Sequence, residues 1–213
     1  SILIKMGIAL ITSKMIAVFV GPGGMAYIGN FRNFMTSLEG ISTLAFSSGV
    51  VKYVGENEDK EKELTKIITT VLVTFLVFST VLGFLIFVFS DFLCAKFFGN
   101  NLQYEIVFKV VAIVLPFSVV SVLFVSIING LGSYSKLIYA TIISNIIALV
   151  LTVLLIYEFK LVGALLSTAL NPTILFTINF FYVPKELQLL SRINLKQYDF
   201  SVLKKLAGFS IMI

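Results

Sequence analysis

Long uninterrupted runs of apolar residues dominate the chain and define its expected fold. Residues 67–89 carry no charge and consist almost wholly of Val, Leu, Ile, Phe and Thr, and comparable runs occupy 110–128, 137–156 and 161–183. Each run is long enough to cross a hydrocarbon core of about 30 Å at about 1.5 Å per residue. Because backbone groups in lipid must bond within their own segment, these runs predict transmembrane α-helices rather than strands.

The first fifty residues are less uniform and predict two helices joined by a turn. Residues 2–20 are apolar apart from two lysines and a few small polar residues, and Gly21-Pro22-Gly23-Gly24 then ends the predicted helix. A second helix is predicted over 25–51, where polar residues form a broad arc that cannot face lipid on all sides. The complete prediction is an all-α, polytopic membrane protein with six transmembrane helices, near 2–20, 25–51, 66–89, 106–128, 137–157 and 161–183.

Beyond the sixth predicted helix the chain changes character twice. Residues 184–205 are polar, whereas the last eight residues, 206–213, are apolar again and stop abruptly. The chain also opens inside a hydrophobic stretch, without an initiator methionine. We therefore expect a fragment cut at both ends, in which residues 206–213 begin a seventh helix.

The composition excludes most other classes of protein. Hydrophobic residues make up 58% of the 213 positions and charged residues 13%, and the mean hydropathy is +1.03. These values exclude a water-soluble globule, a disordered chain and a coiled coil. The sequence has no histidine and one cysteine, Cys94, so imidazole chemistry, histidine-ligated metals and intrachain disulfides are excluded.

Lysine and arginine are distributed unevenly between the loops, which predicts the orientation in the membrane. The second, fourth and sixth loops carry ten of these residues, whereas the first, third and fifth carry two. Because positive charge is retained on the cytoplasmic side, we expect the loops at 52–66, near Lys136 and at 184–205, and the N-terminal side of the first helix, to be cytoplasmic. The net charge of +5 follows from these loops and does not indicate a nucleic-acid partner.

Charged residues at membrane depth are the most informative positions, because a charge near the bilayer centre costs about 2.5–3.5 kcal/mol. Arg32 lies about nine residues, roughly 14 Å, beyond the Gly-Pro-Gly-Gly turn. Glu39 lies two helical turns further along the same face, and Asn30 and Asn33 widen the polar arc. One interpretation is a helix that lines an aqueous cavity, with Arg32 as an anion-binding group. The other is that Arg32 and Glu39 each pair with a neighbouring helix.

Four further polar residues are candidates for the same cavity. Lys14 either adds a second cation to it or extends its long stem to the membrane interface. Asn171 and Asn179 share one face of the sixth predicted helix, and Asn145 lies within the fifth. Such amides either bond between helices or contact a sugar.

Catalytic groupings are absent from the sequence. No pair of acidic residues lies at membrane depth at a spacing suited to Mg²⁺ and a diphosphate, and no P-loop, metal-ligand spacing or Ser/His/Asp set occurs. We therefore expect neither an enzyme nor a cofactor.

Short motifs along residues 3–183 resemble those of a known transporter family. The specific part lies in the first fifty or so residues and comprises Lys14, Ala17-Val18, Gly21-Pro22, Gly24, Asn30-Phe31-Arg32, Thr36, Leu38, Gly40, Gly49-Val50 and Lys52-Tyr53-Val54. Shorter matches follow at Phe98-Gly99-Asn100, Asn129-Gly130, Gly163-Ala164-Leu165-Leu166, Ala169-Leu170 and Pro172. Together they resemble the bacterial O-antigen translocases. These are flippases of lipid-linked oligosaccharides, including lipid III flippases, within the multidrug/oligosaccharidyl-lipid/polysaccharide exporter superfamily.

The resemblance implies a two-lobed transporter with alternating access around a central cavity. Residues 1–183 would form the N-terminal six-helix lobe, 184–205 the cytoplasmic linker between lobes, and 206–213 the start of a truncated second lobe. The implied cargo is an undecaprenyl-diphosphate-linked oligosaccharide such as an O-antigen repeat unit, carried across the bacterial inner (cytoplasmic) membrane by an ion gradient, expected to be of protons. The implied partners are this substrate, membrane lipid, the missing C-terminal lobe, a polysaccharide polymerase and a chain-length regulator.

Two alternatives remain open on the residues alone. A small-molecule or drug:cation antiporter of the same superfamily would favour buried carboxylates over buried cations, and this chain offers Glu39 against Lys14 and Arg32. A membrane enzyme or scaffold of polysaccharide assembly would need a carboxylate cluster in the rest of the full-length protein.

Overall fold

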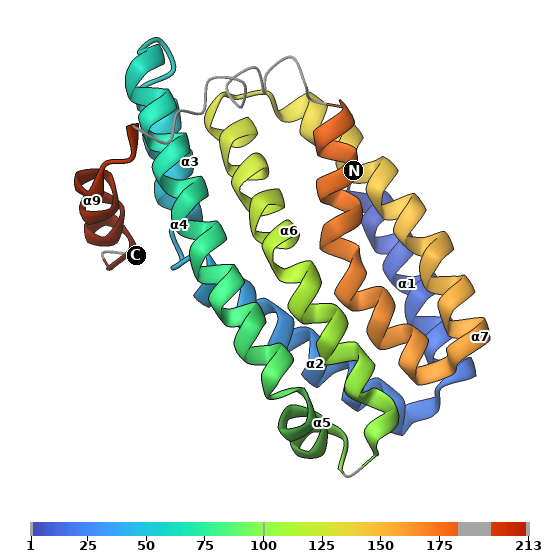
Figure 1. The fold of residues 1–213 in the computed structure, drawn as a ribbon. Helices are drawn as coiled ribbons and strands as arrows, with labels where there is room; N and C mark the ends of the chain where they lie inside the picture. Colours follow the sequence, from blue (N-terminus) through green and yellow to red (C-terminus); the bar gives the residue numbers. More distant parts are fainter. Residues whose placement is uncertain (1, 100, 183–196, 212–213) are drawn as a thin grey trace.

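Helices joined by short turns make up the computed structural model, which describes residues 2–99, 101–182 and 197–211 (Figure 1). In chain order they are α1 (Ile2–Phe19), α2 (Gly21–Ser42), α3 (Ser47–Glu56), α4 (Glu61–Val88), α5 (Ser90–Phe98), the 3-10 helix η1 (Leu102–Tyr104), α6 (Glu105–Gly130), α7 (Tyr134–Tyr182) and α9 (Phe200–Ile211). No strand occurs in the described part of the chain, and the predicted all-α fold is confirmed.

Three helical stretches of the described residues are long and apolar enough to cross a membrane: Glu61–Val88, Leu102–Gly130 and Leu137–Phe181. Large apolar side chains on their outer faces are exposed, and on α4 they recur at helical spacing as Val77, Val81, Phe84 and Val88. A continuous apolar stripe of this kind is unfavourable in water but is solvated by lipid. The chain is a polytopic helical membrane protein, as predicted, while the number of six spans stays a prediction.

The longest helix, α7, reverses direction at a single residue. Lys160 has a φ of 50° and a ψ of −120°, and the limbs on either side of it run antiparallel in Figure 1. These limbs correspond to the helices predicted over 137–157 and 161–183. The tight reversal leaves no room for a side chain at Gly163, where a Cβ would lie 1.8 Å from the carbonyl oxygen of Leu155.

The prediction of one continuous helix over 25–51 is wrong, because the chain breaks between α2 and α3. Leu44 and Ala45 both adopt left-handed conformations, with φ of 50° and 53°. The N–H of Leu44 donates to the carbonyl of Ile41 (3.1 Å), and the N–H of Ala45 donates to the carbonyl of Gly40 (3.0 Å). This pair of bonds defines a Schellman helix end, so the polar arc is divided between two helices.

The break predicted over Gly21-Pro22-Gly23-Gly24 is confined to its first residue. Gly21 has a φ of 80°, which turns the chain, and α2 begins at that same residue. Pro22 occupies the first turn of α2, where its missing N–H would have had no helical acceptor. The turn is therefore short, and Arg32 lies about three helical turns into α2.

Helix α6 packs against α3, α4 and α7. Its close approach to α4 depends on Gly83, because a Cβ there would lie 2.6 Å from the carbonyl oxygen of Ala112. That carbonyl has no helical donor, since the residue four positions further on is Pro116, which lacks an N–H. A cluster of aromatic rings fixes α2 and α5 against α6; its members are Phe31, Phe34, Phe97, Phe98 and Phe108.

Helix α9 packs against α3 and α4 (Figure 1). Its Leu206 is fully buried. Just before the helix, Asp199 forms an ion pair with Lys66 at 2.5 Å, and its backbone N–H donates to Oγ1 of Thr70 at 3.1 Å. Residues 183–196, which include most of the predicted linker, lie outside the described residues, so the predicted division of the chain into lobe and linker stays a prediction.

Replacing Asp199 with asparagine should loosen α9. The bonds that Asp199 accepts from Lys66 and from the backbone N–H of Ser201 lower its pKa from the ordinary 3.8 to about 2. Because the folded pKa is the lower one, the ionised carboxylate stabilises the docked helix above about pH 4, and this stabilisation is lost as the pH falls through about 2. Intrinsic-rate-corrected amide exchange of α9 should thus be constant between roughly pH 5 and 8, and faster in Asp199→Asn. Asp59→Asn, in the α3–α4 turn, is the control; equal exchange in both variants would exclude this role of the ion pair.

Candidate functional site

Two adjoining cavities lie among α1, α2, α3, α6 and α7. The first cavity has a volume of about 580 Å³ and is lined by α1, α2, α6 and both limbs of α7. The second cavity has a volume of about 570 Å³ and is lined by α2, α3, α6 and α7. Five residues line both and join the two spaces: Glu39, Ser118, Asn145, Asn171 and Pro172.

One face of α2 forms a wall of the first cavity. Its members recur every three or four residues, as Met25, Ile28, Gly29, Arg32, Met35, Thr36 and Glu39. A different face of the same helix buries Phe31 and Leu38 in the apolar core. Burial of this apolar stripe fixes the rotation of α2 and so directs Arg32 into the cavity.

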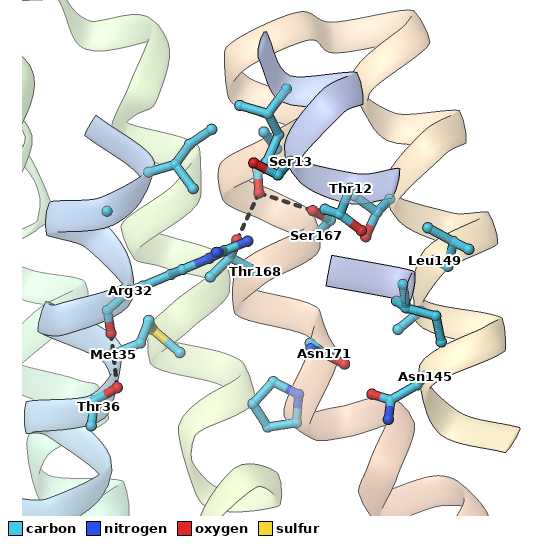
Figure 2. Close-up of a pocket in the computed structure, with 18 of the residues that line it drawn as sticks. Thr12, Ser13, Arg32, Met35, Thr36, Asn145, Leu149, Ser167, Thr168 and Asn171 are labelled. Atoms are coloured by element: carbon cyan, nitrogen blue, oxygen red, sulfur yellow. Dashed lines mark hydrogen bonds between the residues drawn. The ribbon is translucent and has the colours of Figure 1, made fainter. Parts of the chain in front are cut away.

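Arg32 extends from α2 across the first cavity, towards Ser13 of α1 and Thr168 of α7 (Figure 2). It is exposed to the cavity, and the ion pairs found among the described residues all involve other cations. The cavity is therefore lined by a guanidinium that has no ion-pair partner in the described part of the chain, a group with five N–H donors in one plane.

Three of the hydroxyl groups that line the first cavity with Arg32 already donate hydrogen bonds to backbone carbonyls. Ser167 and Thr168 both donate to the carbonyl oxygen of Ala164 at 2.9 Å, and Thr36 donates to the carbonyl oxygen of Arg32 at 3.0 Å (Figure 2). The oxygens of these hydroxyls remain available only as acceptors. An anion in this part of the cavity would consequently be bound by the guanidinium rather than by the three hydroxyls.

Glu39 lies where the two cavities meet. It is half-buried, and its carboxylate forms no ion pair within the described part of the chain. Its backbone carbonyl accepts a bond from Oγ1 of Thr43 at 2.8 Å, next to the end of α2. Arg32 and Glu39 thus place opposite charges on one wall, two helical turns apart, without neutralising each other.

The structure divides the predicted site residues into two groups. Four of them line the cavities: Arg32, Glu39, Asn145 and Asn171. Four do not: Lys14, Asn30, Asn33 and Asn179. Their contributions to substrate binding stay predictions.

The residues outside the cavities differ in their surroundings. Lys14 is exposed on α1, and Asn30 and Asn33 are exposed on a face of α2 that is separate from the cavity wall. Asn179 is fully buried, and neither its amide nitrogen nor its amide oxygen has a hydrogen-bond partner among the described residues.

Helix α6 contributes a polar wall that was not predicted from the sequence. Ser118, Ser121, Ser126 and Asn129 line the second cavity together with the valines at 122 and 125. Positions 118, 121, 122, 125, 126 and 129 follow the three-and-four-residue repeat of one helix face. That repeat was the available signal, but it lies inside a run that otherwise indicates only a transmembrane helix.

The fold and the cavities define a polytopic helical membrane protein with polar side chains in two internal cavities. Among the residues that the structure describes, no group of three or more His, Cys, Asp or Glu residues is placed to hold a metal ion. The chain belongs to the family of polysaccharide biosynthesis proteins, whose family model matches residues 1–204.

Two curated relatives are similar to this chain. The lipid III flippases of Escherichia coli (strain K12) and Shigella flexneri are each 32% identical to it over 114 residues. The matched segment covers 54% of this chain and 27% of each relative, so the comparison spans about a quarter of their length. No solved structure matches the chain significantly.

Proposed function

We propose that this chain is part of a membrane transporter that flips lipid-linked oligosaccharides, with the diphosphate of the cargo bound at Arg32. The observation that carries the proposal is a guanidinium without an ion-pair partner among the described residues, in a cavity of mixed polar and apolar lining between apolar helices. The similarity to lipid III flippases supports the substrate class. Flipping breaks no covalent bond, so the proposed protein is a transporter and not an enzyme.

The head group of the cargo must give up hydration when it leaves water. A diphosphate that leaves water loses strong hydrogen bonds, and an uncompensated charge in an apolar medium is very costly. A guanidinium replaces part of this hydration, because its planar fork binds two phosphate oxygens at once. The polyprenyl tail stays in lipid, so the protein has to solvate only the head group.

In the full-length protein, we propose that a second lobe closes the open side of the cavity and that the two lobes alternate access across the bacterial inner membrane. The proposed cargo is an undecaprenyl-diphosphate-linked repeat unit such as O-antigen, and the proposed driving force is a proton gradient. The excess of Lys and Arg in the loops at 52–66, near Lys136 and at 184–205 supports a cytoplasmic location for these loops. A polysaccharide polymerase and a chain-length regulator are the proposed neighbours in the membrane.

A drug:cation antiporter is the second candidate, and Glu39 is the observation that favours it. This carboxylate lines both cavities and has no ion-pair partner in the described ranges, which suits it to bind a cation or carry a proton. Arg32 on the same wall repels a cation, and this repulsion favours an anionic cargo. A membrane enzyme or scaffold of polysaccharide assembly lacks a supporting observation of this kind.

Translocation by the purified full-length protein in liposomes tests the proposal. The probe is undecaprenyl diphosphate bearing a short oligosaccharide, placed in the inner leaflet and detected by a membrane-impermeant lectin when it reaches the outer leaflet. We expect lectin binding to grow faster than in protein-free liposomes. If lectin binding grew at the same rate with and without the protein, and the protein transported a cationic dye, the flippase proposal would be wrong and the antiporter would be supported.

A further inference from the structure

We propose that the second cavity binds the uncharged sugar portion of the cargo, while the first cavity, with Arg32, binds its phosphate portion. This inference rests on the proposed function and assigns different parts of the cargo to the two adjoining cavities.

Hydroxyls and amides line the second cavity and alternate with apolar side chains. The polar members include Ser47, Ser121, Ser126, Asn129, Thr141 and Ser144. The apolar members include Val51, Val122 and Leu175. A sugar ring presents the same mixture, since its hydroxyls donate and accept hydrogen bonds while its C–H faces pack on apolar groups. A volume of about 570 Å³ is within the range of small-molecule sites.

The charged residues that line the cavities favour different positions for the phosphates and for the sugars of the head group. Glu39 is the one charged residue among the described residues that line the second cavity, and Arg32 lines only the first. A carboxylate repels phosphate but does not repel a neutral saccharide. The phosphates are therefore expected beside Arg32 and the sugars beyond Glu39.

Ser121 provides an independent indication of a ligand. Its hydroxyl oxygen is buried and has no hydrogen-bond partner among the described residues. Ser118 and Ser144, which also line this cavity, donate instead to carbonyl oxygens of their own helices, at 2.7 Å in both cases. Buried polar groups are normally bonded, and rotation of this side chain about χ1 towards the second cavity would let a sugar hydroxyl supply the partner that Ser121 lacks.

The two cavities share part of their lining, so one head group is expected to extend from one into the other. Asn145 and Asn171 line each of them and lie where the two cavities adjoin. The first cavity reaches Met25 near the α1–α2 turn, and the second reaches Asn129 near the end of α6. The head group is thus expected to lie with its phosphates towards the α1–α2 turn and its sugars towards the α6–α7 turn.

Binding of two probes to the purified full-length protein in detergent tests this arrangement. The probes are undecaprenyl diphosphate alone and the same lipid bearing an oligosaccharide. Ser121→Ala should weaken binding of the sugar-bearing probe about fivefold, the value of one hydrogen bond, and leave the bare probe unchanged. Val125→Phe, which fills part of the second cavity, should show the same selectivity with a larger loss. Thr69→Val is the matched control, because Thr69 is also buried and has no hydrogen-bond partner among the described residues, but lines neither cavity.

The outcomes separate this inference from the proposed function. If Ser121→Ala and Val125→Phe weaken only the sugar-bearing probe, the subsite is supported. If they affect both probes equally, or neither, while Arg32→Ala weakens both, the subsite is wrong and the flippase stands. If the wild-type protein binds neither probe, both proposals fail.

Discussion

Arg32→Ala is expected to lower the rate of oligosaccharide flipping by about a hundredfold. A charge-assisted hydrogen bond contributes about 1.5–3 kcal/mol, and loss of a bidentate pair corresponds to a factor of this size. The neighbouring hydroxyls of Thr36, Ser167 and Thr168 cannot substitute, because each already donates to a backbone carbonyl. The measurement is the translocation rate in liposomes that contain equal amounts of folded wild-type or variant protein.

The same variant should fold normally. Arg32 is exposed to the cavity and forms no ion pair with the described residues, so its truncation leaves no buried charge behind. Substitutions of this kind change the free energy of unfolding by roughly 0.5 kcal/mol or less. Arg32→Lys keeps the charge but loses the planar fork, and about a tenfold lower rate is expected.

Lys96→Ala is the control for a general loss of positive charge. Lys96 lies exposed on α5 and lines neither cavity, so its removal should leave flipping unchanged. Wild-type rates in Arg32→Ala, at normal levels of folded protein, would remove Arg32 from the mechanism. Equal losses in both variants would point to the overall charge of the protein rather than to the cavity.

The end of α2 shows where sequence patterns are insufficient. Helix α6 ends in a Schellman motif with Gly132 in the left-handed conformation, at a φ of 67°, and a glycine of this kind is visible in the sequence. Helix α2 ends in the same motif with Leu44 in the corresponding position. Nothing in the residue type signals a left-handed leucine, so 25–51 was predicted as one helix. Tertiary packing stabilises the break and compensates for the conformational strain of its left-handed residues.

The candidate site likewise depends in part on residue spacing within one helix, which the sequence shows, and in part on how the helices pack, which it does not. The spacing of Arg32 and Glu39 places both on one helix face, and this was predictable from a repeat of 3.6 residues. Whether that face meets a cavity depends on how α1, α6 and α7 surround it. Asn171 and Asn179 share a face by spacing, yet Asn171 lines both cavities and Asn179 is buried away from them. The second cavity could not be predicted for the same reason, since α2, α3, α6 and α7 form it jointly.

Gly163→Ala is expected to have the largest effect on stability. A Cβ at this position would lie 1.8 Å from the carbonyl oxygen and 2.3 Å from the carbonyl carbon of Leu155, so the obstacle is backbone and cannot rotate away. The two limbs of α7 would have to separate beside the one-residue turn at Lys160. Overpacking of this kind costs about 3 kcal/mol or more. Thermal unfolding of the purified protein, together with the amount recovered from membranes, measures the loss.

Gly7→Ala is the matched control, because the chemical change is identical and a Cβ on Gly7 would meet no atom within 4 Å. Inside helix α1 this substitution should stabilise the protein slightly, by about 0.5–1 kcal/mol, since alanine loses less conformational freedom than glycine on folding. The two variants should therefore shift the unfolding temperature in opposite directions. If Gly163→Ala unfolded at the wild-type temperature, the limbs of α7 would have to be further apart than the contact with Leu155 requires. The wall that α7 contributes to both cavities would then be placed differently.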